Sequence, residues 1–98
     1  MSYIVTARWR PRAGETAAIE AILRELAAAI RDEPGNVSFT VHRARDDTRD
    51  IFLHEVYKSE EAFKAHREMQ HFKTFVLQRA VPLLEQREIR MWSVADDI

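Results

Sequence analysis

The hydrophobic pattern of this chain changes period at Ser59, and that change constrains the fold more than any other feature. From Ile51 to Lys58 apolar and polar residues alternate, which predicts a β-strand. From Ser59 to about Gln70 the apolar residues recur at helical spacing. The Ser59 hydroxyl is suited to cap the first turn, and Glu60 and Glu61 place negative charge there. A strand that leads directly into an amphipathic helix predicts a sheet with that helix packed on one face.

The same two periods divide the rest of the chain. Alternation predicts strands over 3–10, 36–45 and 86–94, and helical spacing predicts helices over 15–32 and from Phe72 toward Pro82. The resulting order, β-α-β-β-α-β, is that of the ferredoxin-like unit. We therefore predict an α+β fold in one domain, residues 1–98, with both helices on one face of a four-stranded antiparallel sheet.

The second and third predicted strands are adjacent in the sequence, so they should form a hairpin. Val37, Phe39 and Val41 are expected on the inner face. Aligned apolar faces result if Phe39 lies opposite Tyr57, Val41 opposite Glu55 and His42 opposite His54. A shift of two residues would keep the same faces and change every partner.

The face of the sheet away from the helices is expected to carry several large apolar side chains. It would present Ile4, Phe52, Val56 and either Trp92 or Met91, mixed with polar residues. Such a surface is too apolar to leave in water, and self-complementary packing of two copies would cover it. We therefore expect a homodimer formed through this face.

Composition excludes several classes of function. The net charge of −1 predicts no nucleic-acid or membrane partner. The chain has no Cys, which excludes disulfides and thiolate sites and is typical of a reducing compartment. It shows neither a leader-like N-terminus nor an apolar run long enough to span a bilayer, so a cytoplasmic location is expected.

The chain resembles the antibiotic biosynthesis monooxygenase family of dimeric α+β barrel proteins over nearly its whole length. The residues that carry the resemblance are Glu33-Pro34-Gly35, Glu55, Tyr57, Ala62-Phe63, His66, His71-Phe72 and Val81 to Glu85. Members include cofactor-independent oxygenases of quinols or polyketide phenols, haem-degrading enzymes and a sugar-phosphate isomerase of autoinducer catabolism. The resemblance implies the fold more securely than the reaction.

Three residues form the predicted catalytic group. Strand alternation places Glu55 and Tyr57 on one face, and helical spacing places Phe63 and His66 on one face. His66 would take a proton from a phenol, quinol or carbon acid, while Glu55 would orient it or act as the base itself. The other reading is that Glu55 and His66 form a structural pair that ties helix to sheet.

A flat apolar substrate would need aromatic walls. The predicted substrate-binding residues are Trp9, Phe39, Phe63, His71 and Phe75. The expected function is a cofactor-independent monooxygenase acting on a quinol or polyketide-type phenol. The alternatives are an isomerase that uses the same base without oxygen, and a non-catalytic ligand-binding dimer.

No cofactor and no metal are expected. His66 and His71 are five residues apart, about 140° round a continuous helix, which would keep their rings from sharing one ion. A cross-strand pair of His42 and His54 is the remaining metal route. The haem-degrading members carry Asn on the first strand, Trp at the position of His66 and His at that of Val76, and this chain departs from all three.

Overall fold

The computed structural model describes residues 2–98. Its elements follow the predicted order; the helix predicted from Phe72 toward Pro82 is present as η1, and one further short helical segment, η2, precedes the last strand. In chain order they are β1 (Tyr3–Pro11), α1 (Thr16–Arg31), β2 (Asn36–Arg43), β3 (Ile51–Tyr57), α2 (Glu60–Glu68), η1 (Phe72–Ala80), η2 (Val81–Leu83) and β4 (Leu84–Ser93).

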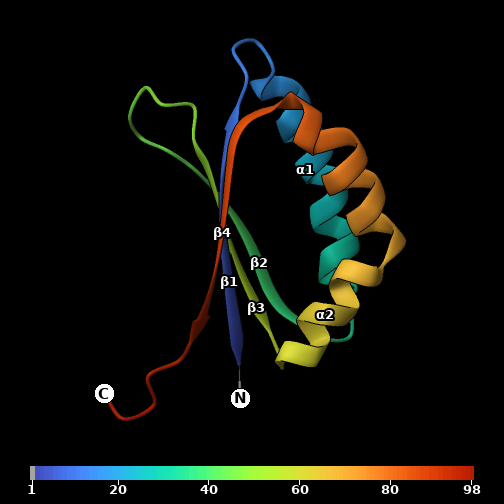
Figure 1. Cartoon of the computed structure of the whole chain (residues 1–98), viewed down its shortest axis with the longest axis vertical. Coiled ribbons are helices and arrows are strands. Elements are labelled where there is room, and N and C mark those ends of the chain that lie inside the picture. Colours follow the sequence, from blue (N-terminus) through green and yellow to red (C-terminus); the bar gives the residue numbers. More distant parts are fainter. Residues whose placement is uncertain (1) are drawn as a thin grey trace.

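The four strands form one antiparallel sheet in the order β2-β3-β1-β4. Figure 1 shows this sheet nearly edge-on, with α1, α2 and η1 covering one of its faces and no element of the described chain covering the other. The predicted ferredoxin-like α+β fold with helices on one face is therefore confirmed.

The register between β2 and β3 differs by two residues from the one first predicted. Phe39 lies opposite Glu55, and His42 lies opposite Phe52, so His42 and His54 do not form a cross-strand pair. Both registers keep the same faces, so alternation alone could not separate them. An irregularity between Asn36 and Ser38 also turns Val37 outward, where it is 58% exposed, against the prediction that it points inward.

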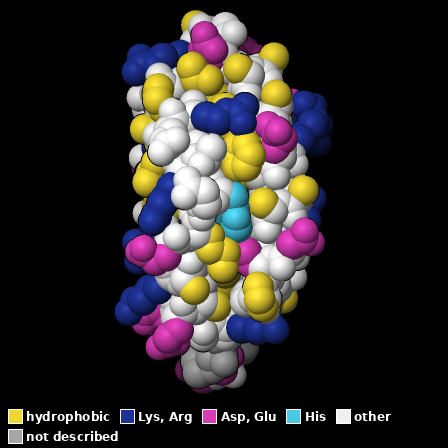
Figure 2. Space-filling view, turned by 90° about the vertical axis from the view of Figure 1, so that its right-hand side faces the viewer, with side chains coloured by type: hydrophobic (Ala, Val, Ile, Leu, Met, Phe, Trp, Pro, Cys, Tyr) yellow, Lys and Arg dark blue, Asp and Glu magenta, His cyan; other side chains and the backbone are white. Residues whose placement is uncertain are grey.

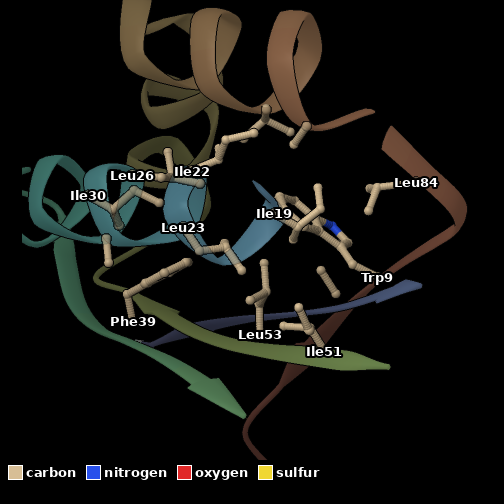
Figure 3. Packing of buried hydrophobic residues seen from close by; sticks show 14 residues of the cluster. Trp9, Ile19, Ile22, Leu23, Leu26, Ile30, Phe39, Ile51, Leu53 and Leu84 are labelled. Carbon is tan, nitrogen blue, oxygen red and sulfur yellow. The ribbon is translucent and has the colours of Figure 1, made fainter. Parts of the chain in front are cut away.

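The main core lies between α1 and the sheet. The apolar stripe of α1 is fully buried, as its spacing predicts, and packs on residues of β1, β2 and β3 (Figure 3). α1 also contacts η1, whose Val76 and Ala80 belong to the same cluster, so helix packing and sheet packing share one core. This cluster holds α1 in place and fixes where its C-terminal end, Asp32 and Glu33, meets the rest of the molecule.

The second helical region is divided into two segments. The Ser59 side chain accepts a hydrogen bond from Ala62 N–H at 3.1 Å, so the predicted cap is present. The helix ends at Glu68, because Met69 has an extended backbone (φ −74°, ψ 148°). It resumes as η1, a π-helix with a wider turn, in which Val81 N–H donates to the carbonyl of Val76, five residues earlier.

The uncovered face of the sheet carries Phe52 and Trp92, each 41% exposed. Trp92 rather than Met91 belongs to this face, because it pairs with Ile4, and its indole N–H donates to Thr6 Oγ1 at 2.8 Å. Within residues 2–98 no helix is long and apolar enough to cross a membrane.

Candidate active site

A cavity of about 380 Å³ lies between the sheet and the helices. Its walls are mostly apolar, with Val5, Ala7 and Trp9 from β1 on one side and Phe63 and Phe72 on the other. The polar side chains that reach it are Glu55, His66, Arg67 and Arg87. On the helix-covered face of the molecule, Figure 2 shows a histidine surface bordered by hydrophobic side chains, with Lys and Arg nearby. A mostly apolar cavity with a few polar groups is the usual form of a small-molecule site.

Glu55 is the acidic group of the cavity. Strand alternation turns it toward the helices, and it is only 7% exposed. Tyr57 Oη donates to Glu55 Oε1 at 2.7 Å. Burial raises the pKa of Glu55 to about 7, partly offset by the Tyr57 bond, so its two protonation states are both populated near neutrality. Burial, and then the nearby Glu55 carboxylate, raise the pKa of Tyr57, which keeps that phenol protonated.

His66 is held by the carboxylate of Glu33, which the sequence analysis did not include among the candidate site residues. Its Nδ1 lies 2.8 Å from Oε2 of Glu33, and both side chains are 3% exposed. An ionised carboxylate only accepts hydrogen bonds, so Nδ1 carries the proton and Nε2 carries the lone pair. Burial lowers the pKa of His66 and Glu33 opposes that shift, so the ring is neutral at physiological pH.

The Nε2 atom of His66 is available to a ligand. It makes no hydrogen bond within residues 2–98. In that range the only fully buried side-chain nitrogen or oxygen without a partner is Nε1 of Trp9, so Nε2 keeps access to open space. Aromatic rings surround the imidazole: Tyr57 and Phe72 at 5.2 Å and Phe63 at 5.9 Å between centroids.

Glu33 reaches His66 because the chain after α1 approaches α2 very closely. A Cβ on Gly35 would lie 2.5 Å from Ala62 Cβ, so glycine is needed for this approach. Lys58 N–H also donates to the Gly35 carbonyl at 2.9 Å, which ties the same turn to the end of β3. The sequence did carry a signal, since Glu33-Pro34-Gly35 supports the family resemblance, but the pattern by itself is typical of a turn.

His71 joins the same carboxylate. Its Nε2 lies 2.5 Å from Oε2 of Glu33, so one oxygen bridges two imidazoles. The angular argument that kept His66 and His71 apart is wrong, because it assumed a continuous helix and the helix ends at Glu68. The extended residue Met69 turns the chain so that both rings converge on Glu33.

These three residues are also the set that could hold a metal ion. Their donor atoms lie within 4.8 Å of one another, and two imidazoles with one carboxylate suit Zn²⁺ or Fe²⁺. Donors around a shared ion stand about 3 Å apart or more, given metal–ligand distances of about 2 Å. The two distances to Glu33 are hydrogen-bond distances, so the cluster as it stands is a hydrogen-bonded network.

The predicted site residues divide into two groups. The cavity wall contains Glu55, His66, Trp9, Phe39 and Phe63. Tyr57, His71 and Phe75 lie outside it. The Tyr57 phenol is bonded to Glu55, the His71 ring to Glu33, and the Phe75 ring lies under Arg79, with 5.1 Å between guanidinium and ring centroid. For Tyr57 and His71 any part in the chemistry would therefore be indirect. The sequence analysis did not place Glu33, Arg67 or Arg87 in the site.

Solved structures resemble this chain over nearly its full length. Rv0793 from Mycobacterium tuberculosis is 26% identical, with a TM-score of 0.89 over 98% of this chain and 97% of that one. PA3566 from Pseudomonas aeruginosa is 25% identical, with a TM-score of 0.87 over 95% and 93%. A Nitrosomonas europaea protein named as a candidate antibiotic biosynthesis monooxygenase is 22% identical, with a TM-score of 0.90 over 97% and 91%, and at that identity it supports the fold alone.

No curated protein matches the sequence. The family model for antibiotic biosynthesis monooxygenases matches residues 2–78, which includes β1 through most of η1 and every residue of the Glu33–His66–His71 cluster. The chain therefore belongs to the antibiotic biosynthesis monooxygenase family.

Proposed function

We propose that this protein is a cofactor-independent monooxygenase that acts on a quinol or a polyketide-type phenol, with His66 as the general base. The observation that carries the proposal is the arrangement of His66: Nδ1 is bound to the buried Glu33 carboxylate, Nε2 has no hydrogen-bond partner within residues 2–98, and the side chain lines an apolar cavity. A carboxylate that fixes the tautomer and supports the charge of an imidazolium is what a histidine base requires. Glu33 thus takes the orienting role that the sequence analysis gave to Glu55.

The substrate itself supplies the electrons for oxygen. His66 Nε2 removes a proton from an anthrone-like CH₂ group or its enol. The resulting carbanion adds to O₂, and protonation gives a hydroperoxide. Loss of the second C–H proton breaks the O–O bond, so that the carbon becomes a carbonyl and the distal oxygen leaves as water. The balance is CH₂ + O₂ → C=O + H₂O.

Glu55 is suited to donate the proton that the leaving oxygen needs. Its pKa of about 7 keeps a protonated fraction at neutral pH, and it lines the same cavity as His66. The Tyr57 hydroxyl, which is bonded to it, holds the carboxyl in place. Burial raises the pKa of Glu55 and lowers that of His66, so at neutral pH the cavity offers a partly protonated acid and a neutral imidazole base.

An isomerase is the second candidate, and one observation favours it. An acid and a base that both line one cavity are also what a proton transfer between two carbons needs, with no oxygen consumed. A non-catalytic binding module is the third reading. It predicts that Glu55 and His66 serve only to join helix to sheet, and that their replacement changes stability without changing any turnover.

The test is oxygen consumption with a panel of quinols and anthrone-like phenols. His66→Ala should reduce the rate by about 10²-fold or more, the usual contribution of a positioned base. His42→Ala, which removes an exposed histidine of the uncovered sheet face, is the matched control and should keep the native rate. Dialysis against EDTA should leave the rate unchanged. Equal rates for the native protein and His66→Ala would rule out this mechanism, and substrate conversion without oxygen uptake would favour the isomerase.

A further inference from the structure

Two arginines line the cavity and have no acidic partner. Within residues 2–98, neither the Arg67 nor the Arg87 side chain makes a hydrogen bond or a salt bridge, although both reach the cavity wall. Several other arginines of this small domain bind carboxylates: Arg10 binds Asp50 at 2.8 Å and Arg43 binds Glu20 at 2.8 Å. The cavity is therefore lined by two guanidiniums that no carboxylate of the described residues binds.

The two side chains come from opposite sides of the cavity. Arg87 belongs to β4, directly opposite Trp9 of β1, and so lies on the helix-covered face of the sheet. Arg67 follows His66 on α2, and its guanidinium lies over the Phe63 ring, 4.8 Å from the centroid. A ligand between the sheet and α2 would meet a cation on each side.

The charge balance of the cavity is positive. The single carboxyl group that lines it is Glu55, which is partly protonated near neutrality and already bonded to Tyr57. Arg87 is exposed overall, but the partial burial of its guanidinium lowers its pKa, and the charge of Glu55 opposes that shift. Charged groups next to apolar walls are stabilised when a ligand supplies the opposite charge.

We propose that Arg67 and Arg87 bind an anionic substituent, a carboxylate or a phosphate, on a flat aromatic substrate of this cavity. This inference rests on the proposed function for the identity of the site and adds the class of substrate. The apolar walls bind the rings, and the guanidiniums bind the anion in the paired geometry that carboxylates and phosphates accept. The volume of about 380 Å³ is near the lower end for ligand pockets, so the substrate is small.

The test compares matched ligands that differ in charge. The probes are 2-naphthol, 3-hydroxy-2-naphthoate and 2-naphthyl phosphate, and binding is read from Trp9 fluorescence in a Trp92→Phe background, since only Trp9 lines the cavity. The naphthoate or the phosphate should bind about tenfold more tightly than naphthol, as expected for charge-assisted hydrogen bonds. Comparison of the two anions shows which group the site prefers.

Arg87→Met should remove that preference and leave naphthol binding nearly unchanged, because methionine keeps the apolar part of the side chain. Arg67→Met should reduce it. Arg45→Met, which removes an exposed arginine from the β2–β3 loop, should preserve it. Equal affinity for naphthol and both anions, or an equal loss of all three in Arg87→Met, would overturn the inference. If the protein prefers the anions but consumes no oxygen, the anion-binding inference is supported and the oxygenase proposal is not.

Discussion

Glu33 is the residue on which the candidate site depends most, because one of its oxygens binds both imidazoles. Removing its charge while keeping its shape separates its electrostatic role from its packing role. In Glu33→Gln the amide oxygen can still accept from Nδ1 of His66, but the imidazolium loses a stabilising neighbour.

We expect Glu33→Gln to lower kcat/KM by about 10²-fold, comparable to the loss of a base. The acidic limb of the pH–rate profile should also move to lower pH, because a histidine without its carboxylate partner is harder to protonate. Glu61→Gln, at an exposed position of α2, is the control. A normal profile with a uniformly reduced rate would indicate a purely structural role for Glu33.

Glu55 makes a separate prediction about stability. Its pKa rises from 4.5 to about 7 on folding, so between these values the folded state binds more protons than the unfolded state. The free energy of unfolding should therefore fall as pH rises from about 4.5 to about 7. Because glutamine stays neutral, Glu55→Gln should lose this dependence. Measured against the native protein, its free energy of unfolding should be higher at pH 8 than at pH 5, by up to about 3 kcal/mol. Urea unfolding of both proteins at the two pH values measures this difference. The same change in unfolding free energy between pH 5 and pH 8 in both proteins would contradict the prediction.

At the scale of elements, the approach of the α1–β2 turn to α2 brings Glu33 to His66. Gly35→Ala should force the two apart, because the new Cβ would lie 2.5 Å from that of Ala62. We expect a loss of about 1–3 kcal/mol in stability, the usual cost of overpacking, together with reduced activity.

The double variant Gly35→Ala/Ala62→Gly provides the control for that experiment. Without the Ala62 Cβ, the nearest contact of the new methyl group becomes the Ala62 Cα at 3.4 Å. Activity should recover at least in part, although glycine lowers the stability of α2. Failure of the double variant to recover any activity would mean that the close approach does not control the site.

The local sequence pattern predicted where the helices and strands lie, but it did not predict the contacts between them. Alternation put Glu55 on the inner face, and helical spacing put His66 beside Phe63, because both periods follow directly from backbone geometry. The convergence of His71 depends on the torsion of a single residue, Met69, which no glycine or proline marks. The β2–β3 register stayed ambiguous because a shift of two changes neither face. Glu33 was missed because its role arises only when the α1–β2 turn packs against α2.

At the scale of the whole molecule, the uncovered sheet face leads us to propose that two copies associate through it. The face exposes Phe52 and Trp92 next to Ile4 and Val56. The native protein should sediment as a dimer at micromolar concentration. Phe52→Asp should shift it toward the monomer, because burying an unpaired carboxylate is unfavourable. Ala28→Asp, on the exposed side of α1, should not. A native protein that sediments as a monomer would refute the proposal.

The wide turn of η1 has a consequence for how such proteins diversify. Phe72, Val76 and Leu77 of η1 all line the cavity. The opposite wall of the cavity belongs to the sheet, where strand pairing fixes the positions of the side chains. Deleting one residue early in η1 would let the wide turn relax to ordinary α-helical pitch, which absorbs the deletion locally and leaves the later side chains near their places. A single codon lost or gained there would thus change the groups at the wide turn that meet the substrate while leaving Glu55 and the His66–Glu33 bond intact, which offers one short evolutionary route from one substrate to another.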